Sequence, residues 1–482
     1  MTDRVSALDF STLYLAEGNT PLHVGSVMIF EPTAGFDYDR LIHLVSARLV
    51  EIPRYRQRIV EVPGNLAPPV WVDDPAFDVS YHVRRSALPR PGTDEQLEEF
   101  VARITPRPLD LNRPLWEAYF IEGLYRGRFA LVTKTHPALV DGVDALDLAQ
   151  VLLSTDPTDS TRGVAEPVSW IPHRPPNSLE LLVGAMGDLA RSPRALADTV
   201  SRSVGDLAST AKRVAGAAGD IAGALARVST RPAPTSPLNA RVGGARRFVM
   251  VGTDLQDYRR VREQVTGPKT EEVTINDVVL ATLAGALRTW LLTRGESVTV
   301  GTTVRAMVPV SIESPTEARP KVSDRHGHAI RAFFVDLPVG EPAASMRLHQ
   351  IAFMMRQQLQ VGRAVDAATL VAVGDFAPPG MYALASRVGQ AVSRRLYNLA
   401  VTNVPGPQHP MYAAGAQLLA SYPVMPLSPG QALTVGLTSY DGGVYYGLLV
   451  DRDAIPDVDV LGQAIVDSLT ELLQIQDGTV EV

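Results

Sequence analysis

The segment Phe129-Ala-Leu-Val-Thr-Lys-Thr-His-Pro-Ala-Leu-Val-Asp-Gly142 carries the main structural and chemical signal of this sequence. Its first part, Phe129 to His136, is apolar and β-branched and predicts a strand. An Asp-Gly turn follows five residues after the histidine. A histidine at the end of a strand can serve as a general base, because an unperturbed imidazole has a pKa of about 6.5. Taken alone, the pattern also fits a histidine without a chemical role in a polar turn.

The rest of the first 155 residues alternates between strand and helix patterns. Buried strands are predicted at 25–30 and 115–121, and helices at 41–49, 93–104 and 143–152. The helix at 93–104 opens with a Thr-x-x-Gln capping box. This mixture of elements predicts layers of helix and sheet, an α/β or α+β fold.

Residues 156–245 differ in composition. Prolines at 172, 175 and 176 punctuate the start, and an alanine-rich stretch without proline runs from 194 to 231. Its apolar residues recur every three or four positions, which predicts an amphipathic helix with a narrow apolar seam. We interpret it as a connecting helix docked on two domains. The alternative is a peripheral contact with a membrane or lipid droplet, in which Lys212, Arg213 and Arg227 face lipid headgroups.

The α/β pattern resumes at Arg246 and continues to the end of the chain. It predicts helices at 273–292 and 346–359, strands at 298–310 and 332–337, and a strand pair at 433–437 and 444–450 around the hairpin turn Tyr440-Asp-Gly-Gly443. We therefore expect an N-terminal domain at 1–160, a helical connector at 161–245 and a C-terminal domain at 246–482.

Length and composition exclude several classes of protein. A chain of 482 residues suits two domains of ordinary size. The formal net charge of -7 argues against a nucleic-acid partner. The absence of cysteine excludes disulfides and thiolate chemistry. The N-terminus lacks a signal-peptide core, and no run of about 18 apolar residues occurs, so we expect a cytoplasmic protein without a membrane span.

Several catalytic motifs are missing from the sequence. It contains neither a G-x-S-x-G elbow nor an H-E-x-x-H zinc motif. The phosphate-binding patterns G-x-x-x-x-G-K-[ST] and G-x-G-x-x-G are also missing. Serine hydrolase, metalloprotease, NTPase and dinucleotide chemistry are therefore disfavoured.

The segment Lys134 to Gly142 resembles the H-H-x-x-x-D-G motif of bacterial wax ester synthases and diacylglycerol acyltransferases. The wider group around that family includes chloramphenicol acetyltransferase, carnitine acyltransferases and peptide-synthetase condensation domains. Further blocks resemble the family in the same order along nearly the whole chain: Pro21-Leu-His-Val-Gly25, Arg113-Pro-Leu-Trp-Glu117, Thr274-Ile-Asn-Asp277, Arg305-Ala-Met-Val-Pro-Val310 and Asn403-Val-Pro-Gly-Pro407.

The resemblance implies two chloramphenicol-acetyltransferase-like domains joined by a helical connection. It implies acyl transfer from acyl-CoA, as a substrate, to diacylglycerol or a long-chain alcohol, with no metal, cofactor or obligate protein partner. In the family the second histidine of the motif is the base, and the Asp-Gly pair, here Asp141 and Gly142, holds the turn. Asn276 and Asp277 resemble a structural contact near the domain interface. The block from Asn403 to Pro407, with Pro405 and Gly406, resembles a backbone turn near the centre. The resemblance implies that the substrate-binding residues include Asn276, Asp277, Asn403, Pro405 and Gly406.

One position departs from the family pattern. Counting back from Asp141, His136 is the first motif histidine, and Pro137 stands where the base is expected. Proline cannot transfer a proton, and neighbours on a strand face opposite sides, so His136 does not simply replace it. A second departure is His328, where the family has asparagine after a glycine. We hypothesise that either His136 or His328 supplies the base, although 326–328 also fits a solvent-exposed polar turn.

Three functions remain open from the sequence. The first is an active acyltransferase that makes triacylglycerol or wax esters. The second is a family member that has lost catalysis and binds lipid or a partner through its acyl-chain tunnel. The third is a transferase for another hydroxyl or amine acceptor, which would require a polar acceptor pocket.

Overall fold

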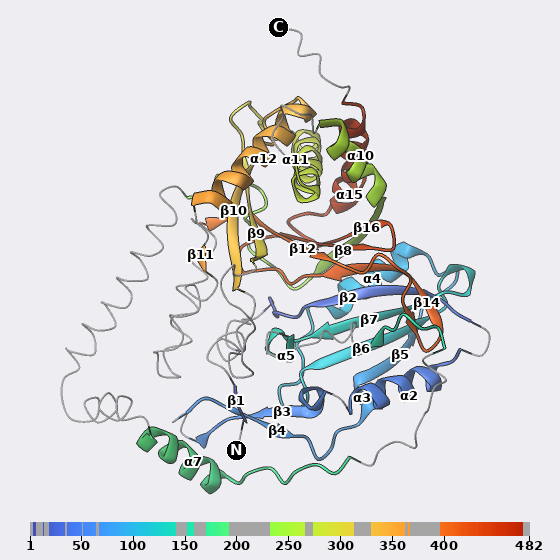
Figure 1. Cartoon of the computed structure of the whole chain (residues 1–482), viewed down its shortest axis with the longest axis vertical. Coiled ribbons are helices and arrows are strands. Elements are labelled where there is room, and N and C mark those ends of the chain that lie inside the picture. Colours follow the sequence, from blue (N-terminus) through green and yellow to red (C-terminus); the bar gives the residue numbers. More distant parts are fainter. Residues whose placement is uncertain are drawn as a thin grey trace, which may run out of the picture.

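A computed structural model of the chain describes residues 3–5, 13, 19–33, 36–50, 52–63, 67–140, 152–158, 170–191, 232–265, 273–312, 329–361, 365–366 and 396–475. Within this part, two large β-sheets lie one above the other, each with its own helices (Figure 1). We call the layer around the six-stranded sheet the N-terminal lobe and the layer around the seven-stranded sheet the C-terminal lobe. The predicted layering of helix and sheet is confirmed.

The N-terminal lobe is built on a six-stranded sheet with helices on both faces. Its strand order is β13 (Tyr412–Ala413), β14 (Ala416–Val424), β2 (Gly25–Glu31), β7 (Phe129–Thr135), β6 (Trp116–Glu122) and β5 (Val83–Ala87). Alternate residues of β2 and β7 face α2 (Tyr38–Arg48) on one side and α4 (Asp94–Ile104) on the other. The Thr93–Gln96 capping box of α4 is present as predicted.

Shorter elements surround this sheet. A three-stranded sheet has the order β1 (Asp3–Arg4), β4 (Val70–Asp73) and β3 (Gln57–Val60). The short helices are η1 (Pro53–Arg56), α3 (Val79–His82), η3 (Tyr125–Gly127) and α5 (Pro137–Val140). Helix α7 (Ser178–Arg191) packs Leu181 against the small sheet.

The C-terminal lobe has helices on one face of a mixed sheet. The strand order is β11 (Val365–Asp366), β10 (Ala329–Leu337), β9 (Val304–Ile312), β12 (Leu399–Pro405), β15 (Leu433–Tyr440), β16 (Gly443–Asp451) and β8 (Arg246–Asp254). Strand β12 runs parallel to both neighbours, and the other pairs are antiparallel. The helices are α10 (Leu255–Val265), α11 (Ile275–Thr293), α12 (Ala344–Val361) and α15 (Val458–Leu473).

Helix α11 is the apolar centre of the C-terminal lobe. In the described part of the chain it is the one helix long and apolar enough to cross a membrane. However, its residues from Asp277 to Leu287 are all buried in the lobe, against α10, α12 and α15. The apolar composition of α11 is therefore explained by its place in the core.

Strand β14 joins the two lobes, because it lies late in the sequence but pairs with β2 of the N-terminal sheet (Figure 1). Its residue Pro423 presses on the C-terminal sheet at Gly436 and Gly447, which face each other across β15 and β16. A Cβ atom on Gly447 would lie 1.9 Å from the carbonyl oxygen of Pro423. Only glycine permits this approach of two backbones.

Helix α4 forms a second contact between the lobes. The side chain of Glu98 accepts a hydrogen bond of 2.7 Å from the backbone N–H of Met250 on β8. Strand β8 is the edge of its sheet, so Glu98 accepts a hydrogen bond from a backbone N–H that has no partner strand. Around this contact, one apolar cluster includes Val101 of α4, Val132 of β7 and Leu449 of β16.

Most predicted elements of the described chain are present, with shifted ends. The hairpin at 440–443 is confirmed, with positive φ at Asp441 and Gly442 as a two-residue hairpin turn requires. The strand predicted from Val298 begins only at Val304, because the backbone turns between Thr299 and Thr302. Most of the predicted helix at 143–152 and the connector helix at 194–231 lie outside the described residues.

We predict that Gly447→Ala destabilises the protein by about 3 kcal/mol or more, because the new Cβ meets backbone atoms that cannot rotate away. Thermal or urea unfolding measures the change. Gly301→Ala is the matched control, since a Cβ there meets nothing within 4 Å. Equal stability of the two variants would contradict the close approach of Pro423 to Gly447.

Candidate active site

His136 lies immediately after strand β7, which is buried along its whole length. Its backbone N–H donates to the carbonyl of Leu115, and its carbonyl accepts from Leu139 N–H, both at 2.9 Å. The strand ends at Thr135, one residue earlier than predicted, so strand alternation does not determine where His136 points. Pro137 is the first residue of α5, where a missing N–H costs no intrahelical hydrogen bond.

The imidazole of His136 is buried and neutral. Its exposed fraction is 3%, and its Nδ1 accepts a hydrogen bond of 3.2 Å from the backbone N–H of Ala138. Burial disfavours the charged ring and lowers the pKa of His136 to about 4. Because Nδ1 is an acceptor, the proton of the neutral ring is on Nε2, and Nε2 is a hydrogen-bond donor.

A second imidazole, that of His23, lies beside His136. Residues Val24 and Thr135 form an antiparallel bridge, which aligns the segment before β2 with the end of β7. The two ring centroids are 6.4 Å apart and the rings meet edge to face. Burial, then the charge of Lys134, then that of a protonated His136 lower the pKa of His23 to about 2. Its buried Nδ1 has no hydrogen-bond partner among the described residues.

Lys134 places a buried ammonium group near the ring of His23. Its Nζ donates to the backbone carbonyls of Arg107 and Ile104 at the end of α4, and lies 3.9 Å from a carboxylate oxygen of Glu117. Burial lowers the pKa of Lys134 to about 8, partly offset by Glu117. The group therefore still carries most of its positive charge at neutral pH.

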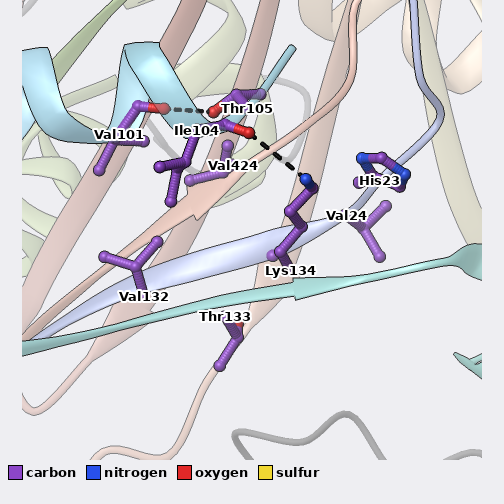
Figure 2. A pocket seen from close by; sticks show the side chains of 10 residues that line it. His23, Val24, Val101, Ile104, Thr105, Val132, Thr133, Lys134 and Val424 are labelled. Carbon is purple, nitrogen blue, oxygen red and sulfur yellow. Dashed lines mark hydrogen bonds between the residues drawn. The ribbon is translucent and has the colours of Figure 1, made fainter. Parts of the chain in front are cut away.

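A small pocket lies between α4 and the strands of the N-terminal sheet. Figure 2 shows Lys134 and His23 side by side along it, with the apolar side chains Val101, Val132 and Val424 further along. Val424 belongs to β14, so the late part of the chain forms part of the wall. The lining residues are His23, Val24, Gly25, Val101, Ile104, Thr105, Val132, Thr133, Lys134 and Val424.

Three of the predicted site residues cannot be placed. Asp141, Gly142 and His328 lie outside the described residues, so their predicted roles remain predictions. His136 is described, and it lies beside His23 at the end of β7.

The predicted pair Asn276 and Asp277 belongs to the start of helix α11. Asp277 forms a capping box with Thr274, through a carboxylate bond of 2.8 Å to its backbone N–H and a return bond of 3.2 Å. Asn276 accepts a bond of 3.2 Å from the side chain of Asn403 on β12. Asp277 therefore has a structural role as a helix cap, and Asn276 ties helix to strand. No hydrogen bond among the described residues links these side chains to His136 or His23.

The expectation of a backbone turn from Asn403 to Pro407 is wrong for its first three residues. Asn403, Val404 and Pro405 continue strand β12, in parallel register with Leu437 to Ser439 of β15. Gly406 follows the strand and donates its N–H to the carbonyl of Ser439 at 2.9 Å. Pairing with β15 extends the strand through Pro405, a residue that together with the following Gly406 suggests a turn in sequence alone.

Sequence reasoning did not identify His23 or Lys134 as site residues. Both stood in quoted motifs, Pro21-Leu-His-Val-Gly25 and Lys134-Thr-His136, but as markers of strands. The missing information was the antiparallel pairing of these two segments. The available signal was a histidine, His23, two residues before the start of a second buried strand, β2. In an antiparallel pair this start lies beside the end of β7.

Comparison with known families assigns both halves of the chain to one group. Residues 5–279 match the wax ester synthase/diacylglycerol acyltransferase catalytic domain, and residues 326–473 match the C-terminal domain of the same group. The probable diacylglycerol O-acyltransferase tgs2 of Mycobacterium tuberculosis is 33% identical over 97% of this chain and 98% of its own. The probable diacylglycerol O-acyltransferase tgs3 of the same species is 44% identical over 54% of this chain and 96% of its own.

Solved structures show the same architecture. The wax ester synthase/diacylglycerol acyltransferase of Marinobacter aquaeolei VT8 superimposes with a TM-score of 0.66 and 27% identity, over 97% of this chain and 98% of its own. The first condensation domain of the calcium-dependent antibiotic synthetase gives 0.58 at 16% identity, over 100% and 98%, which speaks for the fold alone. The two-domain fold expected from the resemblance is confirmed.

We predict that ¹⁵N NMR of histidine-labelled protein shows the ring of His136 with a bare Nδ1 and a protonated Nε2 from pH 8 down to pH 5. The unfolded chain binds a proton near pH 6.5, whereas the folded chain binds it only near pH 4. Stability contributed by this ring is therefore present above pH 6.5 and is lost as the pH falls towards 4. A titration midpoint near 6.5 would contradict the burial of the ring.

Proposed function

Because this chain belongs to the wax ester synthase/diacylglycerol acyltransferase family, we propose that it transfers the acyl group of a long-chain acyl-CoA to the free hydroxyl of diacylglycerol. The match of both family domains and the similarity to tgs2 over nearly the whole chain support the assignment. Long-chain alcohols are a second acceptor class, because an alcohol oxygen attacks a thioester in the same way whichever molecule carries it.

The neutral imidazole of His136, beside the pocket residue His23, is the observation that carries the proposal. Thioester alcoholysis passes through a tetrahedral intermediate whose oxygen bears negative charge. Donors already aimed at that oxygen lower the barrier without reorganisation. We propose the Nε2–H of His136, which the hydrogen bond at Nδ1 leaves as the donor of the ring, for this role, and the ammonium of Lys134 adds positive charge beside the neighbouring ring of His23.

The walls of the pocket support a reaction that must exclude water. Val101, Val132 and Val424 are apolar and Ile104 is buried. A dry site strengthens each electrostatic interaction and protects the thioester from hydrolysis. We expect the acceptor to be drawn from a lipid phase, so the protein would work at a membrane or droplet surface from the cytoplasmic side.

The absence of cysteine gives a clean assay, because a thiol reagent then reports only released CoA. We predict that purified protein releases CoA from palmitoyl-CoA when diacylglycerol is added, with labelled triacylglycerol as the product. His136→Ala should lower kcat by about 10²- to 10³-fold through loss of the oxyanion donor. 1-Hexadecanol in place of diacylglycerol measures wax ester synthesis.

The same assay discriminates the other functions. Release that does not rise above the acceptor-free rate with either acceptor would favour the lipid-binding alternative and overturn the proposal. Unfolding temperatures of wild type and His136→Ala must agree within a few degrees for the kinetic comparison to hold.

A further inference from the structure

We infer that His23 accepts the proton of the acceptor hydroxyl, while His136 donates its Nε2–H to the thioester carbonyl oxygen. This inference rests on the proposed acyl transfer. Pro137 stands where the resemblance places the base, so proton acceptance falls to His23 and donation to the carbonyl oxygen falls to His136. The division follows from which ring nitrogens are free.

His136 is held in the wrong tautomer for a base. The hydrogen bond from Ala138 N–H occupies the lone pair of Nδ1, and the remaining nitrogen, Nε2, carries the proton. To accept a substrate proton, the ring would have to give up this hydrogen bond or its own proton. Pro137 offers no acceptor on its side chain.

His23 is free of the hydrogen bond that fixes the tautomer of His136, so its Nδ1 can carry the accepting lone pair. Its exposed fraction is 6%, and its buried Nδ1 has no hydrogen-bond partner in the described part of the chain. An unpaired buried polar atom destabilises the fold, and a substrate hydroxyl would supply the missing partner of this one. The ring lines the pocket next to Lys134 (Figure 2) and lies 6.4 Å from the ring of His136.

The backbone holds His23 firmly in this place. Val24 exchanges two backbone hydrogen bonds with Thr135, of 2.9 and 2.8 Å. Gly25 lets the strands approach closely, since a Cβ there would lie 2.0 Å from the carbonyl oxygen of Thr133. Ser26 continues the alignment through a hydrogen bond from its N–H to the Thr133 hydroxyl. His23 is therefore as closely fixed to β7 as His136 is.

The proposed step conserves atoms and charge. The hydroxyl proton moves to Nδ1 of His23 as the acceptor oxygen bonds to the thioester carbon. The carbonyl oxygen becomes an oxyanion that accepts the Nε2–H bond of His136. The carbon–sulfur bond then breaks, and the departing CoA thiolate takes the proton from His23. The products are the ester and free CoA, and both imidazoles return to their starting form.

The proton affinity of His23 changes during this cycle. Burial and the charge of Lys134 keep the ring neutral before the substrates react. When the oxyanion forms, a negative charge stands near the ring and favours its protonated form. Collapse of the intermediate removes that charge, so the ring releases its proton to the leaving thiolate.

The test uses the full-length protein, palmitoyl-CoA and diacylglycerol, with CoA release as the readout. His23→Gln keeps a polar side chain of similar size but has no basic nitrogen. We expect its kcat to fall by about 10²- to 10⁴-fold, with little change in the KM for palmitoyl-CoA. His43→Gln, the same change at an exposed position of α2, is the matched control and should match wild type.

Adding Pro137→His to His23→Gln provides the decisive variant. A base restored at position 137 should recover most of the lost rate, because the missing function is proton acceptance. A structural role for His23 predicts no recovery, and that result would overturn the inference. Full activity in His23→Gln alone would overturn it as well, while an active wild type would leave the proposed acyl transfer intact.

NMR of the wild type keeps the inference testable if His23→Gln does not fold. The neutral ring of His23 should show an unprotonated Nδ1 in the ¹⁵N spectrum. A proton on Nδ1 would remove the free lone pair and refute the assignment. A wild type that releases no CoA with any acceptor refutes the proposed function and, with it, this role of His23.

Discussion

The contact of Pro423 with Gly436 and Gly447 is the constraint on which the arrangement of the two lobes depends. It brings the backbone of β14 against β15 and β16 at a distance that no side chain larger than hydrogen allows. Because β14 also pairs with β2, the sheet that carries His23 is fixed to the C-terminal sheet through backbone atoms. The contact of Glu98 with Met250 adds a second tie through α4.

Burial at this junction sets the chemistry of the site. His23, Lys134 and His136 all have a lowered pKa, and in each case burial is the largest cause. Two imidazoles are therefore neutral at physiological pH, whereas the ammonium keeps a charge through its contacts with backbone carbonyls and Glu117. A neutral donor, a neutral acceptor and a fixed cation form a set suited to a reaction that creates negative charge for a short time.

The proline at position 137 leaves the backbone structure intact but affects which residues can transfer protons. As the first residue of α5 it fits without loss of a hydrogen bond. The cost is chemical, because the proline side chain has no group that can transfer a proton. The unpaired Nδ1 of His23 lies on the neighbouring segment, so the chain retains an imidazole for each of the two tasks.

The sequence by itself determined the family, the layered α/β fold, the capping box at Thr93 and the hairpin at 440–443. These features are encoded locally, in the spacing of apolar residues and in short motifs. Tertiary structure alone decided the exchange of β14 into the N-terminal sheet, the strand at Asn403 to Pro405, and the pairing that sets His23 beside His136. The physical reason is that strand pairing joins segments far apart in the sequence, and neither register nor the tautomer fixed by a backbone N–H leaves a mark in local composition.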